Sequence, residues 1–178
     1  VVEGMAAQAQ AIQLGHGLDP STHMGPLISK GHASKVAGFI ADGKKAGASV
    51  LTGGETAGPN ESFVTPTVIA DVTPDMSVVR EEIFGPVVVV TRFDDADEVV
   101  AAANDSDFGL AAGIWTEGLS NATRLAERIH AGTVWINSHA MYDAALPIGG
   151  MKQSGYGRES GQAAMDNYLE LKTVCAIV

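Results

Sequence analysis

The sequence has little cysteine, few basic residues and no long apolar run, and each shortage excludes a class of protein. One cysteine among 178 residues excludes an intrachain disulfide and a multi-cysteine zinc site, and it suits a reducing, cytoplasmic compartment. Eleven basic against 21 acidic residues give a net charge of −10, which argues against binding nucleic acid through its phosphates. No stretch has the ~18 continuous apolar residues of a membrane span. The 5 histidines lack ligand spacing, so no metal is expected.

The remaining composition is that of a globular protein with many tight turns, since 46% of residues are hydrophobic and 21 are glycine. Apolar runs with strand character alternate with segments of helical period, which predicts an α/β fold with a largely parallel sheet and flanking helices. A surface loop is expected at 53–60. Helices are expected at 2–13 and 160–167, and three more are expected to follow the predicted N-caps Ser29, Asp95 and Ser120. Strands are expected at 49–51, 63–64, 67–69, 87–90, 108–115 and 132–136.

The stretch Arg80–Pro86 leads into four consecutive valines, Val87–Val90. The valines predict a strand buried on both faces, and Gly-Pro before them predicts a turn. Glu81, Glu82 and Phe84 would then lie on the rim of a sheet, where α/β proteins build their sites. A carboxylate there can accept hydrogen bonds from sugar hydroxyls, and a ring offers a flat apolar wall. A charged loop leading into a strand would fit the same residues.

Both ends of the chain carry a further expectation. Residues 168–178 alternate and then become wholly apolar, as a strand does, and such a strand must pair with something outside the domain. We therefore divide the chain into a catalytic-domain portion, 1–167, and an oligomerisation strand, 168–178. Because helical periodicity is already present at Met5 and Ala9, the chain is expected to be a piece of a longer protein.

Six motifs, in order and at matching spacing, resemble the NAD(P)-dependent aldehyde dehydrogenases, and specifically the C-terminal portion of their catalytic domain. The resemblance covers nearly the whole chain. The motifs are Asp19–Ile28, Arg80–Pro86, Asn104–Gly113, Val134–Asn137, Pro147–Glu159 and Tyr168–Thr173.

The resemblance implies a cofactor site. Glu82 resembles the carboxylate that binds the hydroxyls of the nicotinamide ribose, and Phe84 resembles the aromatic residue packed beside that ribose and ring. Lys35, with His32 one helical turn before it, resembles positions that line the cofactor from the facing helix. A solvated surface charge fits Lys35 equally well. NAD or NADP is implied, with NAD favoured.

The resemblance also implies a substrate site in the long loop after residue 136. Tyr142 and Ile148 resemble residues that wall the aldehyde channel, and Asn137 and Ser138 stand at its entrance. The loop is most similar to members acting on apolar or aromatic aldehydes of the phenylacetaldehyde type, and no Lys or Arg in 138–147 would hold a second carboxylate. The glycines of the Pro147–Glu159 motif are expected to serve the backbone.

The family's nucleophilic cysteine and general base have no counterpart in this sequence. Cys175 lies in the apolar terminal segment, without a cation or helix start to activate it, so no catalytic residue is assigned. The chain alone is expected to be inactive, and the full protein to be a homo-oligomer, a dimer or tetramer. Two other functions stay open, a non-catalytic interaction module that pairs through its C-terminal strand and an acyl-phosphate reductase.

Overall fold

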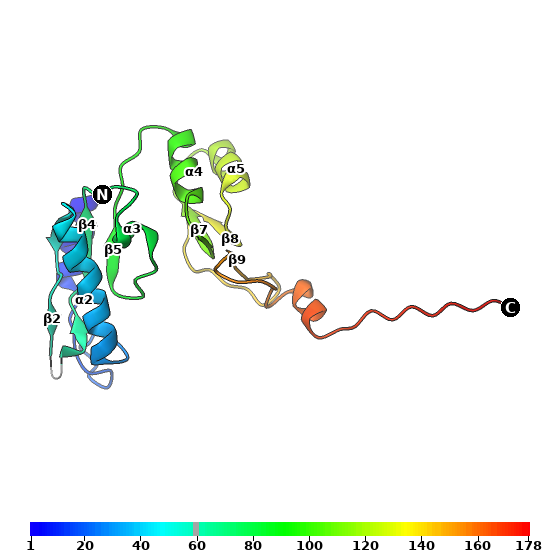
Figure 1. Ribbon diagram of the computed structural model, residues 1–178, viewed down its shortest axis with the longest axis horizontal. Coiled ribbons are helices and arrows are strands. Elements are labelled where there is room, and N and C mark those ends of the chain that lie inside the picture. The colour runs from blue at the N-terminus through cyan, green and yellow to red at the C-terminus, as the bar shows by residue number, and fades with distance from the viewer. Residues whose placement is uncertain (59–60) are drawn as a thin grey trace. The chain divides into compact units, whose positions relative to one another are not determined.

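The computed structural model describes residues 1–58 and 61–178 and divides into two compact units, Val1–Arg92 and Phe93–Val178 (Figure 1). Each unit is described by itself. The predicted loop at 53–60 contains a short strand, and its residues 59 and 60 lie outside the described residues. Among the described residues, no helix combines the length and the apolar character needed to cross a bilayer.

The first unit is built on a three-stranded sheet of β1 (Ser49–Thr52), β4 (Thr67–Ala70) and β5 (Val87–Val89). The central strand β4 runs antiparallel to β1 and parallel to β5, with Thr67 opposite Val87 and Ile69 opposite Val89. A small antiparallel hairpin, formed by β2 (Thr56–Ala57) and β3 (Phe63–Val64), lies between β1 and β4 in the sequence.

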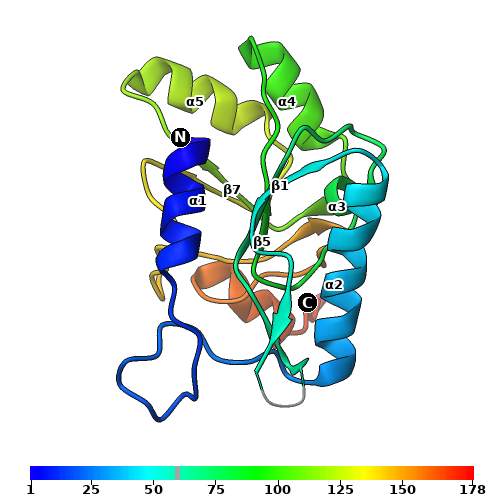
Figure 2. The ribbon, with the colours of Figure 1, turned by 90° about the vertical axis from the view of Figure 1, so that its left-hand side faces the viewer.

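Two helices cover the two faces of this sheet, α1 (Val2–Ala11) on one and α2 (Lys30–Lys45) on the other (Figure 2). The main core forms between α2, the sheet and the short helix α3 (Ser77–Arg80). Its buried residues include Val36 and Ile40 of α2 and Ile69 of β4. The predicted cap of α2 is confirmed, because the Ser29 hydroxyl accepts the backbone N–H of His32 at 3.1 Å.

The prediction that the valine strand is buried on both faces is wrong. Val88 of β5 remains 37% exposed, whereas Thr67, Val68 and Ile69 of β4 are buried. In the described part of the chain, β5 has a neighbouring strand on one side only, while β4 lies between β1 and β5. Position in the sheet therefore decides burial more than the run of valines does.

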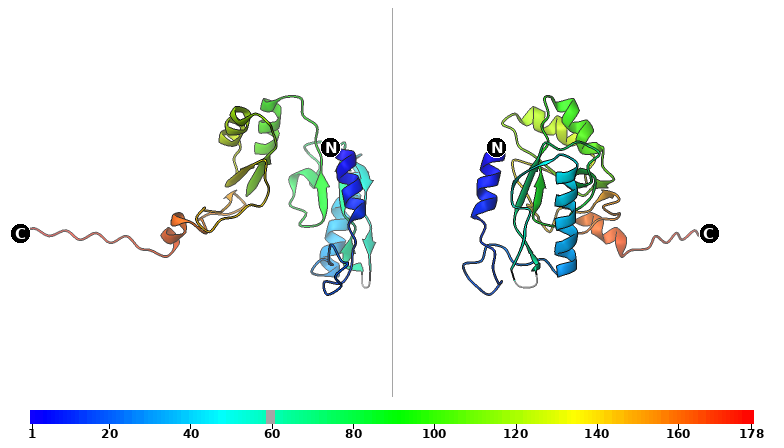
Figure 3. Two further views of the ribbon diagram at one scale, coloured as in Figure 1. Left: turned by 180° about the vertical axis from the view of Figure 1, so that it is seen from behind. Right: turned by 60° about the vertical axis from the view of Figure 1, so that its left-hand side comes forward.

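The second unit contains two helices, α4 (Ala96–Asn104) and α5 (Leu119–Arg128), and the parallel pair β7 (Ala111–Ile114) and β8 (Thr133–Ile136). The unit also contains an antiparallel pair, β6 (Phe108–Gly109) and β9 (Met151–Lys152). The 3-10 helix η2 (Gln162–Asn167) precedes the terminal segment (Figure 3). The predicted α/β class with flanking helices is confirmed. The prediction of a largely parallel sheet holds for the pairs β4–β5 and β7–β8, but β1–β4, β2–β3 and β6–β9 are antiparallel. The sheet β1-β4-β5 is therefore mixed.

Helix starts in the second unit follow the prediction at one helix and depart from it at the other. The Asp95 carboxylate accepts the backbone N–H groups of Asp97 and Glu98, as predicted for α4. The prediction that Ser120 caps α5 is wrong, because the helix begins at Leu119 after Gly118 and has no side-chain cap.

The terminal segment 168–178 has no strand structure in this single chain, and its side chains are exposed. A strand is defined by hydrogen bonds to a neighbour, and this segment has no neighbouring strand among the residues that the structure describes. Its role in assembly stays a prediction.

Candidate cofactor and substrate site

The loop Glu81–Pro86 joins α3 to β5 and presents Glu82 and Phe84 to solvent. Phe84 is 74% exposed and has a left-handed backbone, with φ of 52°. Gly85 lies so close to α2 that a Cβ there would stand 2.7 Å from both methyl groups of Val36. The glycine therefore lets the loop approach the helix while the Phe84 ring remains outside the core.

An open pocket of about 480 Å³ lies beside this ring. Phe84, Gly85 and Pro86 form one wall, and the rest of the lining comes from Met24, Gly25, Pro26, Leu27 and Val64. The structure thus brings the Gly25-Pro26 motif against the Phe84 loop, although the two lie far apart in the sequence. The mostly apolar lining suits the flat face of a ring.

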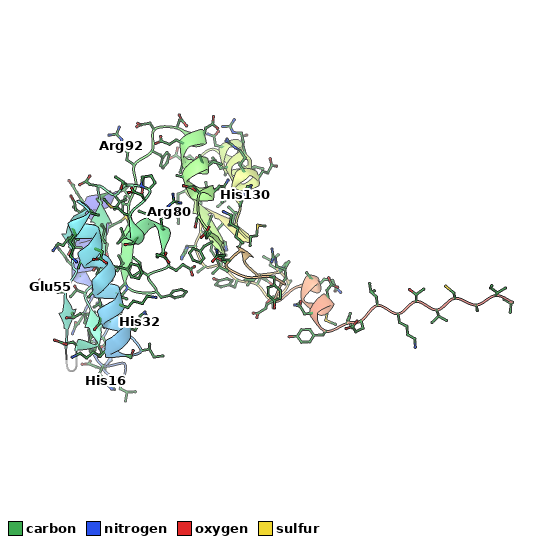
Figure 4. All side chains as sticks on the ribbon, viewed as in Figure 1. His16, His32, Glu55, Arg80, Arg92 and His130 are labelled. Carbon is green, nitrogen blue, oxygen red and sulfur yellow. The ribbon has the colours of Figure 1, made fainter. Side chains whose placement is uncertain are left out.

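Lys35 and His32 lie on the first turns of α2, beside Val36. The exposed Lys35 places its ammonium 5.7 Å from the centre of the Phe39 ring on its own helix. His32 is half-buried, and its position on α2 is marked in Figure 4. Because Gly85 contacts Val36, the structure brings the loop that carries Glu82 and Phe84 to the part of α2 that carries both residues.

The segment before the pocket is held as a compact loop. A bridge between Leu14 and Met24 closes it, and the Thr22 hydroxyl donates to the carbonyl of His16 at 2.9 Å. Within the loop, the backbone N–H and the hydroxyl of Ser21 donate to the Asp19 carboxylate at 2.9 and 2.8 Å and lower its pKa. Met24 therefore reaches the pocket from an ordered loop.

In the second unit, Asn137 directly follows β8 and also has a left-handed backbone, with φ of 51°. Its side-chain amide donates to the Thr116 carbonyl at 2.8 Å, and its side-chain oxygen accepts the Thr116 N–H at 2.9 Å. Both ends of the amide therefore brace the chain that leaves β7. Asn137 is the first residue after β8, and Ser138 follows it, half-buried.

The loop then folds over Trp135 of β8. The indole N–H donates to the carbonyl of Met141 at 2.9 Å, and the Tyr142 ring meets the indole edge-on, with centroids 5.6 Å apart. The His139 ring lies 5.5 Å from the indole, at an interplanar angle of 67°. Tyr142 is 63% exposed on this support, a position suited to contact a ligand.

Ile148 ends the loop in a two-bonded bridge to Glu159, with N–H to carbonyl distances of 2.8 and 2.7 Å. The expected backbone role of the glycines is confirmed: Gly155 and Gly157 have φ of 135° and 76°, and a Cβ on Gly149 would stand 2.6 Å from the Gly157 carbonyl. The motif around Ile148 is therefore a tightly folded frame.

The eight predicted site residues fall into one group in each unit. Four lie in the loop before β5 and on α2 in the first unit, where Phe84 is the one of them that lines the pocket, and four lie along the loop of the second unit. Sequence reasoning missed Met24, Leu27 and Val64 as pocket lining and Trp135 as the support of the loop. The Gly25-Pro26 turn next to Met24 was a usable signal. No sequence signal marked Trp135 as the support of the loop, because an aromatic residue within a strand is usually part of the core.

A sequence model of the aldehyde dehydrogenase family matches residues 1–174. The chain belongs to the aldehyde dehydrogenase family. The betaine aldehyde dehydrogenase of Agrobacterium fabrum is 49% identical over 97% of this chain, and the mitochondrial aldehyde dehydrogenase of Leishmania tarentolae is 47% identical, also over 97%. The chain spans 36% and 35% of these relatives, or about a third of their length.

Solved structures agree on the aldehyde dehydrogenase fold. The NAD⁺ complex of aldehyde dehydrogenase from Bacillus cereus superposes with a TM-score of 0.94 at 50% identity, over 97% of this chain and 35% of that one. The betaine aldehyde dehydrogenase of Staphylococcus aureus in complex with NAD⁺ gives 0.89 at 38% identity, over 93% and 34%. The motif-based identification of the family and its fold is thus confirmed.

Proposed function

We propose that this chain is the C-terminal portion of the catalytic domain of an NAD(P)-dependent aldehyde dehydrogenase, which oxidises an aldehyde to a carboxylate through a thioester. The observation that carries the proposal is the loop Glu81–Pro86. It displays a carboxylate and a left-handed, exposed Phe84 beside an apolar pocket, within a chain that matches the family from residue 1 to 174.

The residues present fit a nicotinamide cofactor. The exposed carboxylate of Glu82 would accept hydrogen bonds from the ribose hydroxyls, and the Phe84 ring would lie against the sugar and the ring beside it. Lys35 and His32 would line the same cofactor from α2. When bound, the cofactor supplies the acceptor for hydride from the substrate carbon. NAD is favoured over NADP because the two superposed structures are described as NAD⁺ complexes.

The nucleophile and the general base are proposed to come from another part of the protein. Cys175 is the one cysteine of the chain, and it is exposed in the terminal segment, far along the chain from both groups of site residues. An exposed thiol without a neighbouring base or helix start is not poised for attack. The 178-residue chain by itself should therefore be inactive.

For the substrate we propose an apolar or aromatic aldehyde of the phenylacetaldehyde type. Tyr142 and Ile148 would form its walls, with Asn137 and Ser138 at the entrance, and residues 138–147 include no Lys or Arg to hold a second carboxylate. A second candidate is betaine aldehyde, because relatives carry that name and an exposed tyrosine ring can bind a quaternary ammonium group.

The test measures NAD⁺ reduction by the full-length gene product with phenylacetaldehyde, betaine aldehyde and succinic semialdehyde. We expect the highest kcat/KM with phenylacetaldehyde. Preference for betaine aldehyde would favour the second candidate, and preference for succinic semialdehyde would exclude both.

Two neighbouring carboxylates provide a matched pair of variants for the cofactor site. Glu82→Gln should raise the KM for NAD⁺ about tenfold, since a charge-assisted hydrogen bond contributes about 1.5–3 kcal/mol. Glu81→Gln, one residue earlier and also exposed, should leave the KM for NAD⁺ unchanged. Equal effects of the two changes would contradict the proposed role of Glu82.

A further inference from the structure

Three interactions that tie the first half of the substrate loop to the rest of its unit all end on Trp135. The indole N–H holds the carbonyl of Met141 at 2.9 Å, and the rings of His139 and Tyr142 meet the indole at 5.5 and 5.6 Å. Trp135 itself is half-buried in β8. One strand residue thus supports residues 139–142 through both its polar and its aromatic groups.

The supported segment has a backbone that needs support. Asn137 and Ala140 both have left-handed backbones, with φ of 51° and 52°, and neither is glycine. Such conformations persist when surrounding contacts specify them. Asn137 is fixed by its two hydrogen bonds to Thr116, so Ala140 is the residue that depends on the contacts made by its neighbours with Trp135.

The second half of the loop is fixed without Trp135. The Asp143 carboxylate accepts the N–H of Ala145 at 2.8 Å, and the carbonyl of Ala144 accepts the N–H of Gly161 at 2.9 Å. Ile148 then pairs with Glu159. The two halves are therefore held by separate sets of contacts. A change at Trp135 should loosen the backbone of residues 138–142 and leave that of residues 143–148 unchanged.

We propose that Trp135 is a positioning residue that sets the place of Tyr142 in the aldehyde channel and thereby the preference for bulky aldehydes, without touching the substrate. This inference rests on the proposed function of the loop. A small aldehyde does not need the Tyr142 wall, so a change at Trp135 should leave its KM unchanged. An aldehyde with a phenyl group contacts that wall, so the same change should raise its KM.

The experiment compares Trp135→Phe, which keeps a ring and removes the N–H, with Trp135→Leu, which removes both, in the full-length gene product. Trp115→Phe is the matched control, because Trp115 follows the neighbouring strand and is 71% exposed. We expect the KM for phenylacetaldehyde to rise about tenfold in Trp135→Leu and less in Trp135→Phe. The KM for acetaldehyde, the KM for NAD⁺ and kcat should stay within about twofold. Equal losses with both aldehydes would overturn the proposal.

Hydrogen exchange read by mass spectrometry gives a second measurement that needs no activity. In Trp135→Phe, peptides covering 138–142 should exchange faster than in the unchanged protein, while peptides covering 143–148 should exchange at the same rate. Unchanged exchange in 138–142 would overturn the positioning role even in an active enzyme. Faster exchange there, in a protein that oxidises no aldehyde, would support the positioning of the loop and refute the proposed function alone.

Discussion

Phe84 has a conformation that a phenylalanine adopts at a cost, and this separates stability from function at a single residue. An L-residue in the left-handed conformation costs about 1–2 kcal/mol of strain. Glycine has no such strain, but it loses more backbone entropy on folding, which offsets part of the gain. The ring is 74% exposed, so its removal sacrifices little burial. We predict that Phe84→Gly raises the free energy of unfolding by about 0.5–1 kcal/mol and weakens NAD⁺ binding, measured by urea unfolding and by the KM for NAD⁺.

Phe93→Gly is the control, since Phe93 is also exposed but is not among the left-handed residues. It should lose stability and keep the KM. If Phe84→Gly is destabilised like Phe93→Gly and its KM for NAD⁺ is unchanged, then the Phe84 backbone is not strained and its ring does not help to bind NAD⁺.

The same residue scale shows what the sequence could and could not provide. Glu82 and Phe84 could be placed at the rim of a strand from their own local motif, whereas Tyr142 and Ile148 were assigned through the resemblance to the family. The pairing of the Asn137 amide with Thr116 was out of reach, because it follows from the register of β7 and β8, in which Ile114 lies opposite Ile136. Contacts across strands depend on a register that no single segment encodes.

At the scale of elements, the two helices of the second unit offer a comparison of a real cap with an apparent one. Asp95 accepts two backbone N–H groups at 2.9 and 2.8 Å, and Glu98 accepts the N–H of Asp94 at 2.8 Å. Asp95→Ala should therefore lower the free energy of unfolding by about 1 kcal/mol. Ser120→Ala, inside the first turn of α5, should change it by less than about 0.5 kcal/mol. If thermal unfolding shows that Asp95→Ala loses no more stability than Ser120→Ala, the capping role of Asp95 is contradicted.

The misreading of Ser120 and that of the valine strand have a common physical origin. A hydroxyl residue near a helix start, or a run of β-branched residues, fits several positions in a fold equally well. Gly118 already has a non-helical backbone and is the N-cap of α5, two residues before Ser120, and β4 takes the central place in the sheet. Local pattern predicts that an element exists, while its neighbours determine its limits and its burial.

At the scale of the whole molecule, the terminal segment 168–178 carries the prediction about assembly. Tyr168, Leu171, Val174 and Ile177 are largely exposed in the single chain, although a strand of this composition normally pairs. We predict that the full-length protein is a dimer or tetramer in analytical ultracentrifugation and that deleting 168–178 lowers its mass to that of a smaller species. An unchanged oligomer after the deletion would assign assembly to other surfaces.

The intact mass of the native gene product decides between the enzyme and the alternative of a non-catalytic interaction module. A mass far above the 18.4 kDa of this chain would leave room for a nucleophile and a general base, and would favour the enzyme. A mass near 18.4 kDa would favour a module that pairs through its terminal segment.

The fixed ends of the loop 138–147 have a consequence for engineering. Asn137 is locked to Thr116 at one end and Ile148 to Glu159 at the other, so the residues between them form a cassette bounded by two anchors. Libraries confined to this cassette, with Trp135 kept, would vary the chemistry of the channel while leaving the strands on which it stands in register. On the proposed role of the loop, we expect the exchange of such cassettes between relatives to transfer substrate preference without transferring the scaffold.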